Sequence, residues 1–217
     1  MTHAISQPAL TLDGADFPVR RIFCIGRNYA DHAAEMGNEV DREKPFFFTK
    51  SAHALTAPGD VPYPPGTEDL HHEVELVLAI GTELDDASPE QAAAAIVGRA
   101  VGLDMTRRDL QGEAKDKRRP WDAAKDFDHS AIIAPLSSAA AGPGIRLSVN
   151  GAVRQDGALE QMIFSEAEIV AFLSSLYTLM PGDLIMTGTP AGVGAVTRGD
   201  SLHAEIDGLP VLDARIV

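Results

Sequence analysis

The order of hydrophobic and polar residues predicts a chain built mostly of β-strands. Short apolar runs rich in Val, Ile, Leu and Phe recur between clusters of Gly, Pro, Asn and Asp, which is typical of strands and turns. Strands are expected at residues 20–26, 44–50, 72–80, 97–103, 145–149, 152–154 and 184–187. The turn signal Asn150-Gly151 joins two of them into a hairpin. Residues 201–217 alternate in the manner of edge strands around Asp207-Gly208.

Helical signals are fewer. Residues 88–96 begin with Ser88 as a possible cap and Pro89 in the first turn, followed by alanines. Residues 165–179 carry apolar side chains at helical spacing. Shorter helices are expected at 28–36 and 107–117. We therefore predict a strand-dominated α+β fold, with a lead-in over residues 1–18 and a single domain over residues 19–217.

Composition narrows the functional classes. The chain has 18 Lys and Arg against 32 Asp and Glu, a net charge of −14, which disfavours general binding to nucleic acid or anionic membranes. No apolar run is long enough to span a membrane and no secretory signal is evident, so we expect a cytoplasmic protein. The single cysteine, Cys24, excludes an intramolecular disulfide and lies in a predicted buried strand.

The strand that begins near residue 72 carries the first candidate site. Glu73 and Glu75 are two residues apart, so they point to one face of a strand, together with His71. Two carboxylates entering an apolar strand repel each other and lose hydration, and a divalent cation removes both penalties. Asp104 ends the strand predicted at 97–103, and strand pairing can bring it to the same point. Three oxygen ligands favour Mg²⁺ or Mn²⁺, whereas ligation by His71 would favour Mn²⁺ or Zn²⁺. Ion pairing or a solvated strand face is the alternative.

A second candidate is the pair His32 and Glu35, which share one face of the predicted short helix. A carboxylate bonded to imidazole raises its basicity, so the pair can take a proton from water. Gly26 and Gly37 bracket this segment, which can therefore move as a lid. An exposed helix with an incidental His–Glu pair is the alternative.

Cationic and polar residues form a third group. Arg107, Arg108 and Gln111 follow Asp104, and Lys125 comes later; such groups can hold a carboxylate or stabilise an oxyanion. A solvated basic surface is the interpretation of four further cations, Lys115, Lys117, Arg118 and Arg119. The Gly-rich loop 188–194 lacks the Gly-Lys-Ser/Thr ending of a nucleotide site, although Thr189 can offer a hydroxyl to a ligand.

Taken together, four ordered motifs resemble the fumarylacetoacetate hydrolase family, in its short acylpyruvase branch and most of all its bacterial fumarylpyruvate hydrolases. The resemblance extends from about residue 20 to the C-terminus. The motifs are Ile25-Gly26-Arg27-Asn28-Tyr29-Ala30-Asp31-His32, His72-Glu73-Val74-Glu75-Leu76, Leu103-Asp104-Met105-Thr106-Arg107-Arg108-Asp109-Leu110-Gln111 and Thr187-Gly188-Thr189-Pro190-Ala191-Gly192-Val193-Gly194.

The resemblance implies a mixed β-roll, usually a homodimer, and a set of site residues. It implies Mg²⁺ or Mn²⁺ on the acidic residues and a catalytic dyad on a lid. It places oxyanion and substrate contacts at four further positions. The residues concerned are Glu73, Glu75 and Asp104 for the metal, His32 and Glu35 for the dyad, and Arg108, Gln111, Lys125 and Thr189 for the contacts. Many relatives carry a small residue at the position of Arg107, which therefore either contacts a distal substrate carboxylate or faces solvent.

The activity implied is hydrolysis of the carbon–carbon bond of a 2,4-diketo acid, an acylpyruvate such as fumarylpyruvate, which gives fumarate and pyruvate. The same metal site can instead decarboxylate oxaloacetate or tautomerise a 2-oxo acid. A protein that binds a dicarboxylate through the cation without catalysis is the alternative of another class.

Overall fold

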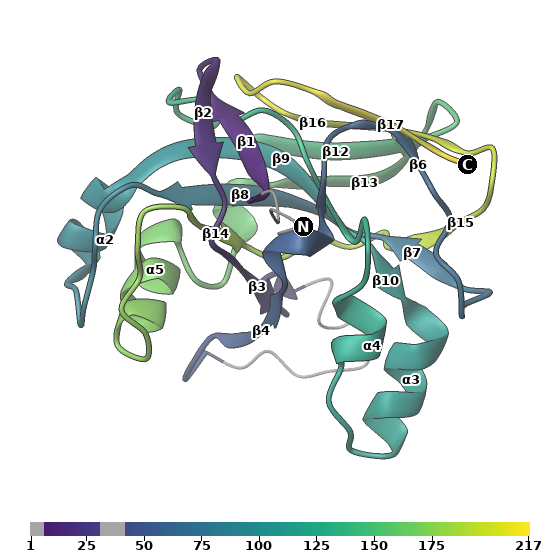
Figure 1. Cartoon of the computed structure of the whole chain (residues 1–217), viewed down its shortest axis with the longest axis horizontal. Helices are drawn as coiled ribbons and strands as arrows, with labels where there is room; N and C mark the ends of the chain where they lie inside the picture. The colour runs from purple at the N-terminus through teal and green to yellow at the C-terminus, as the bar shows by residue number, and fades with distance from the viewer. Residues whose placement is uncertain (1–6, 31–41) are drawn as a thin grey trace, which may run out of the picture.

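The computed structural model describes residues 7–30 and 42–217, and these fold into three sheets, a hairpin and short helices (Figure 1). The strands are β1 (Ala9–Leu12), β2 (Ala15–Pro18), β3 (Arg21–Gly26), β4 (Phe46–Lys50), β5 (Leu55–Thr56), β6 (Gly59–Val61), β7 (Leu70–His72), β8 (Val74–Ile80), β9 (Ile96–Asp104), β10 (Thr106–Arg107), β11 (Ala131–Ile133), β12 (Gly144–Val149), β13 (Ala152–Ala158), β14 (Asp183–Met186), β15 (Gly194–Val196), β16 (Ser201–Ile206) and β17 (Leu212–Ile216). The helices are α2 (Pro89–Ala95), α3 (Arg108–Asp116), α4 (Asp122–Lys125), α5 (Glu166–Ser174) and the 3₁₀ turns η1 (Ala52–Ala54) and η2 (Leu159–Gln161).

The largest sheet has seven strands in the order β4-β3-β14-β8-β9-β11-β5 and mixes parallel with antiparallel pairs. Its central strand β8 is buried along its whole length, which explains why its sequence is a continuous apolar run rather than an alternation. The two sides of this strand face separate clusters of core residues, so the sheet is covered on both faces.

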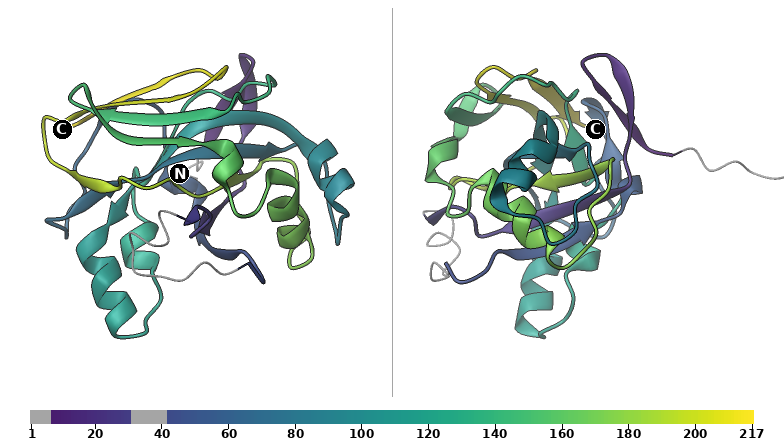
Figure 2. Two further views of the ribbon diagram at one scale, coloured as in Figure 1. Left: turned by 180° about the vertical axis from the view of Figure 1, so that it is seen from behind. Right: turned by 90° about the vertical axis from the view of Figure 1, so that its left-hand side faces the viewer.

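A five-stranded sheet in the order β13-β12-β16-β17-β6 packs over it, as the two views in Figure 2 show. The hairpin predicted at Asn150-Gly151 is present, and both residues have the positive φ of a type I′ turn. Strands β16 and β17 alternate as predicted, but they lie inside the sheet, so the expectation of edge strands is wrong. Their apolar sides complete the core against β8 and β9.

Two segments differ from the sequence prediction. The helix expected over 165–179 ends at Ser174, where the hydroxyls of Ser174 and Ser175 donate to the carbonyls of Ala171 and Phe172 and compete with helical hydrogen bonds. The lead-in, for which no period was evident, contains the antiparallel hairpin β1–β2. The boundary between lead-in and domain stays a prediction.

A buried acidic residue anchors the start of β14. Asp183 accepts hydrogen bonds from the guanidinium groups of Arg20 and Arg21 and from the main-chain N–H of Met180. This fixes β14 against the neighbouring β3. Within the described residues, every helix is too short or too polar to cross a bilayer.

Candidate metal-dependent active site

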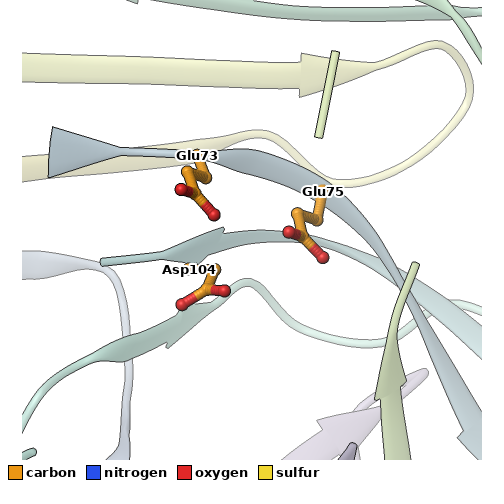
Figure 3. Close-up of side chains that lie close together, drawn as sticks. All are labelled: Glu73, Glu75 and Asp104. Atoms are coloured by element: carbon orange, nitrogen blue, oxygen red, sulfur yellow. The ribbon is translucent and has the colours of Figure 1, made fainter. Parts of the chain in front are cut away.

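Three carboxylates meet where the largest sheet joins the three-stranded sheet β10-β7-β15 (Figure 3). Glu73 lies between β7 and β8, Glu75 lies on β8, and Asp104 is the last residue of β9. The antiparallel pairing of β8 with β9 sets this register, and the N–H of Asp104 donates to the carbonyl of Glu73 at 2.9 Å. One ligand oxygen from each residue lies within 4.8 Å of the others, and all three side chains are buried.

The environment of Glu75 is electrostatically unfavourable for a carboxylate. The main-chain N–H of Gly188 donates to Glu75 Oε2 at 2.8 Å, and no cation pairs with Glu75 among the described residues. Burial, and then the charges of Asp104 and Glu73, raise the pKa of Glu75 well above its usual value. A buried acid of this kind lacks a positive partner, which a divalent cation would supply. The all-oxygen donor set fits Mg²⁺ or Mn²⁺.

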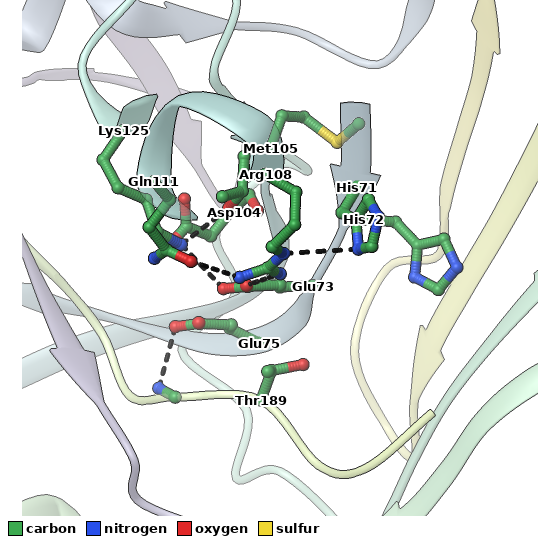
Figure 4. A network of polar contacts seen from close by, with 12 residues as sticks. His71, His72, Glu73, Glu75, Asp104, Met105, Arg108, Gln111, Lys125 and Thr189 are labelled. Carbon is green, nitrogen blue, oxygen red and sulfur yellow. Dashed lines mark hydrogen bonds and ion pairs between the residues drawn. The ribbon is translucent and has the colours of Figure 1, made fainter. Parts of the chain in front are cut away.

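Three cations lie against the other two carboxylates, and Figure 4 shows two of them, Lys125 and Arg108. Lys125 Nζ lies 2.8 Å from Glu73 Oε2 and 2.7 Å from Asp104 Oδ2, and donates to Thr106 Oγ1 at 2.6 Å. Burial alone would lower the pKa of Lys125, but Asp104 and Glu73 outweigh it and raise the pKa, so the side chain stays an ammonium. Lys50 Nζ lies 2.9 Å from Asp104 Oδ1. Lys50 was not predicted as a site residue, because its neighbours in the sequence do not indicate which carboxylate a buried lysine at a strand end will contact.

Helix α3 presents Arg108 and Gln111 to the same point, as their spacing predicts. Arg108 Nη1 donates to Gln111 Oε1 at 2.6 Å and Nη2 to Glu73 Oε1 at 2.5 Å.

His71 lies outside the carboxylate cluster because the strand expected at 72–80 breaks at Glu73. Its Nε2 lies 2.9 Å from Asp69, and its Nδ1 lies 3.3 Å from Arg108 Nε. Burial and then Arg108 lower the pKa of His71.

The opposite wall of the site is the loop 187–190, which carries Thr189. Thr189 Oγ1 accepts a hydrogen bond from Gln155 Nε2 at 2.7 Å, and the same amide donates to the carbonyl of Pro190 at 2.8 Å. Gln155 Oε1 accepts from the N–H of Val74 and lies 3.0 Å from His72 Nδ1. This buried glutamine therefore ties the strand of the acidic residues to the loop of Thr189, and its position in an otherwise exposed stretch of β13 gave no signal in the sequence.

Gly188 and Gly192 allow the loop 188–194 to pack closely against the segments that carry Asn28 and Arg154. Both have positive φ: a Cβ on Gly188 would lie 2.8 Å from that of Asn28, and a Cβ on Gly192 would lie 2.0 Å from the carbonyl oxygen of Arg154. The left-handed backbone conformation at these two glycines is therefore required by packing.

One pocket unites most of the predicted residues. It is lined by Glu73, Glu75, Asp104, Arg108, Gln111, Lys125 and Thr189, together with Ile25, Gly26, Arg27, Phe46, Phe48, Lys115 and Trp121. Lys115 is half-buried in this wall, so its interpretation as solvated surface is wrong, whereas Lys117, Arg118 and Arg119 are exposed as predicted. Arg107 turns away: its guanidinium stacks on Phe127 and donates to the carbonyl of Ala123. His32 and Glu35 lie outside the described residues.

Comparisons with known proteins agree with this arrangement. The family described as "Fumarylacetoacetate (FAA) hydrolase C-terminal" matches residues 21–217. The chain belongs to the fumarylacetoacetate hydrolase family. A fumarylpyruvate hydrolase from a Ralstonia species is 47% identical over 181 residues, 80% of this chain and 94% of the relative. The oxaloacetate tautomerase YcgM of Escherichia coli is 41% identical over 202 residues, 89% of this chain and 91% of the relative.

A solved structure of the same family resembles this one over its whole length. The crystal structure of fumarylpyruvate hydrolase from Pseudomonas aeruginosa in complex with Mn²⁺ and pyruvate superimposes with a TM-score of 0.95 at 46% identity, covering 100% of this chain and 99% of that one. The strand-dominated fold expected from the resemblance is thereby confirmed.

Proposed function

We propose that this chain is a metal-dependent hydrolase that cleaves an acylpyruvate, and that fumarylpyruvate, which gives fumarate and pyruvate, is its substrate. The observation that carries the proposal is the buried cluster of Glu73, Glu75 and Asp104 with Lys125 and Arg108 against it in one pocket. The identity of 46–47% to two fumarylpyruvate hydrolases supports the choice of reaction.

The three carboxylates would hold Mg²⁺ or Mn²⁺, which, when bound, supplies positive charge that stabilises the electron pair left on the pyruvate fragment. Arg108, Gln111 and Thr189 line the space beside the cluster and can donate hydrogen bonds to the oxo-acid end of the substrate. Lys125 remains charged and can stabilise the oxyanion that forms when water adds to the 4-carbonyl group. The bond between C3 and C4 then breaks, and the pyruvate fragment takes up a proton.

From the sequence, we propose that His32, polarised by Glu35, takes the proton from the attacking water. Replacing His32 with Ala should then lower kcat by about 10²–10⁴-fold and leave the fold intact. Full activity in this variant would reject the dyad.

The decisive experiment compares three substrates on the metal-stripped protein before and after addition of Mn²⁺. Fumarylpyruvate and acetylpyruvate are followed by pyruvate release, and oxaloacetate by both pyruvate release and loss of its enol absorbance. We expect metal-dependent cleavage of fumarylpyruvate that disappears in Glu73→Ala. The alternative, oxaloacetate tautomerisation or decarboxylation, is favoured by the 41% identity to an oxaloacetate tautomerase, and turnover of oxaloacetate alone would establish it instead.

We also propose that the protein is a cytoplasmic homodimer. Light scattering on the purified chain tests the dimer, and fractionation of the source cells tests the compartment.

A further inference from the structure

Two cations lie in the wall of the active-site pocket at positions that the proposed mechanism does not use. Arg27 follows β3 directly, and Lys115 lies on α3 with the side chains of Arg108 and Gln111. The spacing 108, 111 and 115 repeats every three or four residues, so one face of α3 lines the pocket. Arg27 has a φ of 61°, a conformation that is unfavourable for a residue with a Cβ and that is often retained at ligand sites.

Aromatic rings frame both cations. Lys115 Nζ lies 5.2 Å from the centre of the Trp121 ring, and Arg27 Cζ lies 5.5 Å from that of Phe46. The rings of Phe46 and Trp121 are themselves 5.2 Å apart, and Phe48 lies 6.0 Å from Trp121. A cavity of about 440 Å³, lined by Arg27 and these three rings, continues outward from the carboxylate cluster, with which it shares Lys125. The outer part of the site thus has aromatic walls, and its charged lining residues are the cations Arg27, Arg119 and Lys125 and one acid, Asp122.

Among residues 7–30 and 42–217, neither cation has an acidic partner at ion-pair distance. In the described part of the chain, Arg27 and Lys115 make no ion pair, whereas Lys117, the residue that caps the C-terminal end of α3, pairs with Glu113 at 2.5 Å. Burial, and then the charges of Arg108 and Arg27, lower the pKa of Lys115. The like charges therefore repel one another, and the negative charge of Glu73 offsets this repulsion only in part. An anion between the two side chains would relieve it.

We propose that Arg27 and Lys115 bind a carboxylate at the far end of the acyl group, so that the enzyme selects acylpyruvates with a second terminal carboxylate. The flat spacer of such a substrate would lie against Phe46, Phe48 and Trp121. This inference rests on the proposed function, because it takes the pyruvate end to lie at the carboxylate cluster. It assigns to Arg27 and Lys115 the role that the sequence suggested for Arg107, which lies elsewhere.

The test compares Arg27→Met and Lys115→Met on two substrates in the presence of Mn²⁺. For fumarylpyruvate, kcat/KM should fall about tenfold or more in each variant, because each loses a charge-assisted hydrogen bond. For acetylpyruvate, which ends in a methyl group, kcat/KM should change less than about threefold. Lys117→Met is the matched control and should leave both substrates unchanged. An equal fall for the two substrates, or no fall for fumarylpyruvate, would overturn the proposal.

A binding measurement separates this proposal from the proposed function. Titration calorimetry of fumarate into the Mn²⁺-loaded protein does not depend on turnover. We expect Arg27→Met and Lys115→Met each to raise the Kd of fumarate at least about tenfold and to leave the Kd of acetate unchanged. Failure of the unmodified chain to release pyruvate would refute the hydrolase, whereas fumarate affinity unchanged in both variants would refute the subsite.

Discussion

Replacing Glu75 with Gln removes one charge from the acidic cluster and keeps its shape. A Gln oxygen can still accept the hydrogen bond from the Gly188 N–H. At separations within 4.8 Å, one pair of like charges costs about 3.5 kcal/mol at an effective dielectric constant of 20. Because Lys125 offsets part of the repulsion from Asp104 and Glu73, we expect the metal-free variant to gain about 1–2 kcal/mol. For a chain of this size, Tm should rise by about 2–8 °C.

The gain should depend on pH. The pKa of Glu75 is raised in the folded protein, so its carboxyl group contributes stability below its ordinary pKa, and that contribution is lost as pH rises through the raised value. Glutamine cannot lose a proton. The difference in Tm between the variant and the unmodified chain in chelator should therefore grow as pH rises above the ordinary pKa of a glutamate.

Adding Mn²⁺ should reverse the order of stability. At a concentration of about 100 times Kd, a ligand that binds only the folded state contributes about 2.7 kcal/mol, or about 5–11 °C in Tm. Glu75→Gln should lose most of this increment, and Glu83→Gln, at an exposed position, should keep it. Scanning fluorimetry with and without chelator measures both the Tm of the metal-free protein and its increase with Mn²⁺. If Glu75→Gln were no more stable than the unmodified chain in chelator and kept the full Mn²⁺ increment, the reasoning about this carboxylate would be refuted.

Three further substitutions test the frame of the site. Asp183→Ala removes the buried partner of Arg20 and Arg21 and should lower the free energy of unfolding by about 3–5 kcal/mol in urea titrations, with kcat of the folded enzyme unchanged. Gln155→Leu leaves the Val74 N–H and the Pro190 carbonyl without their partner and should cost about 2–6 kcal/mol, measured the same way; a cost near zero would mean that water replaces the amide. Gly192→Ala should lower Tm and activity together, since its Cβ would overlap a main-chain oxygen; an unchanged Tm would show that the loop can move away.

Much of this molecule could be predicted from the sequence because its signals are local. The apolar run of β8, the Asn150-Gly151 turn and the capped helix α2 each depend on neighbouring residues, and all three are present. The meeting of Glu75 with Asp104 required only that two apolar strands pair in antiparallel register. The clustering of the three carboxylates, the helical face of α3 and the buried Cys24 followed from the same reasoning. That these carboxylates are metal ligands stays a prediction.

The remaining features depend on contacts between distant segments. Lys50 pairs with Asp104, which is 54 positions away in the sequence. Gln155 on β13 hydrogen-bonds both to Val74 on β8 and to Thr189, and neither segment adjoins β13 in the sequence. Lys115 is followed in the sequence by exposed basic residues, which favoured its interpretation as solvated surface. Its spacing from Arg108 and Gln111, however, places it on the face of α3 that lines the pocket. The break of the strand at Glu73 reflects the change from one sheet to another, which a run of apolar residues does not reveal.

That break has a mechanical consequence. Glu73 stands where the chain leaves the three-stranded sheet, to which α3 is attached through β10, and enters the seven-stranded sheet that carries Glu75 and Asp104. A divalent ion on these oxygens would cross-link the two sheets, so that α3 could not move independently of the seven-stranded sheet. Hydrogen exchange in β7, β10 and α3 should therefore slow as one unit when the ion binds, and chelation should release that whole corner of the molecule.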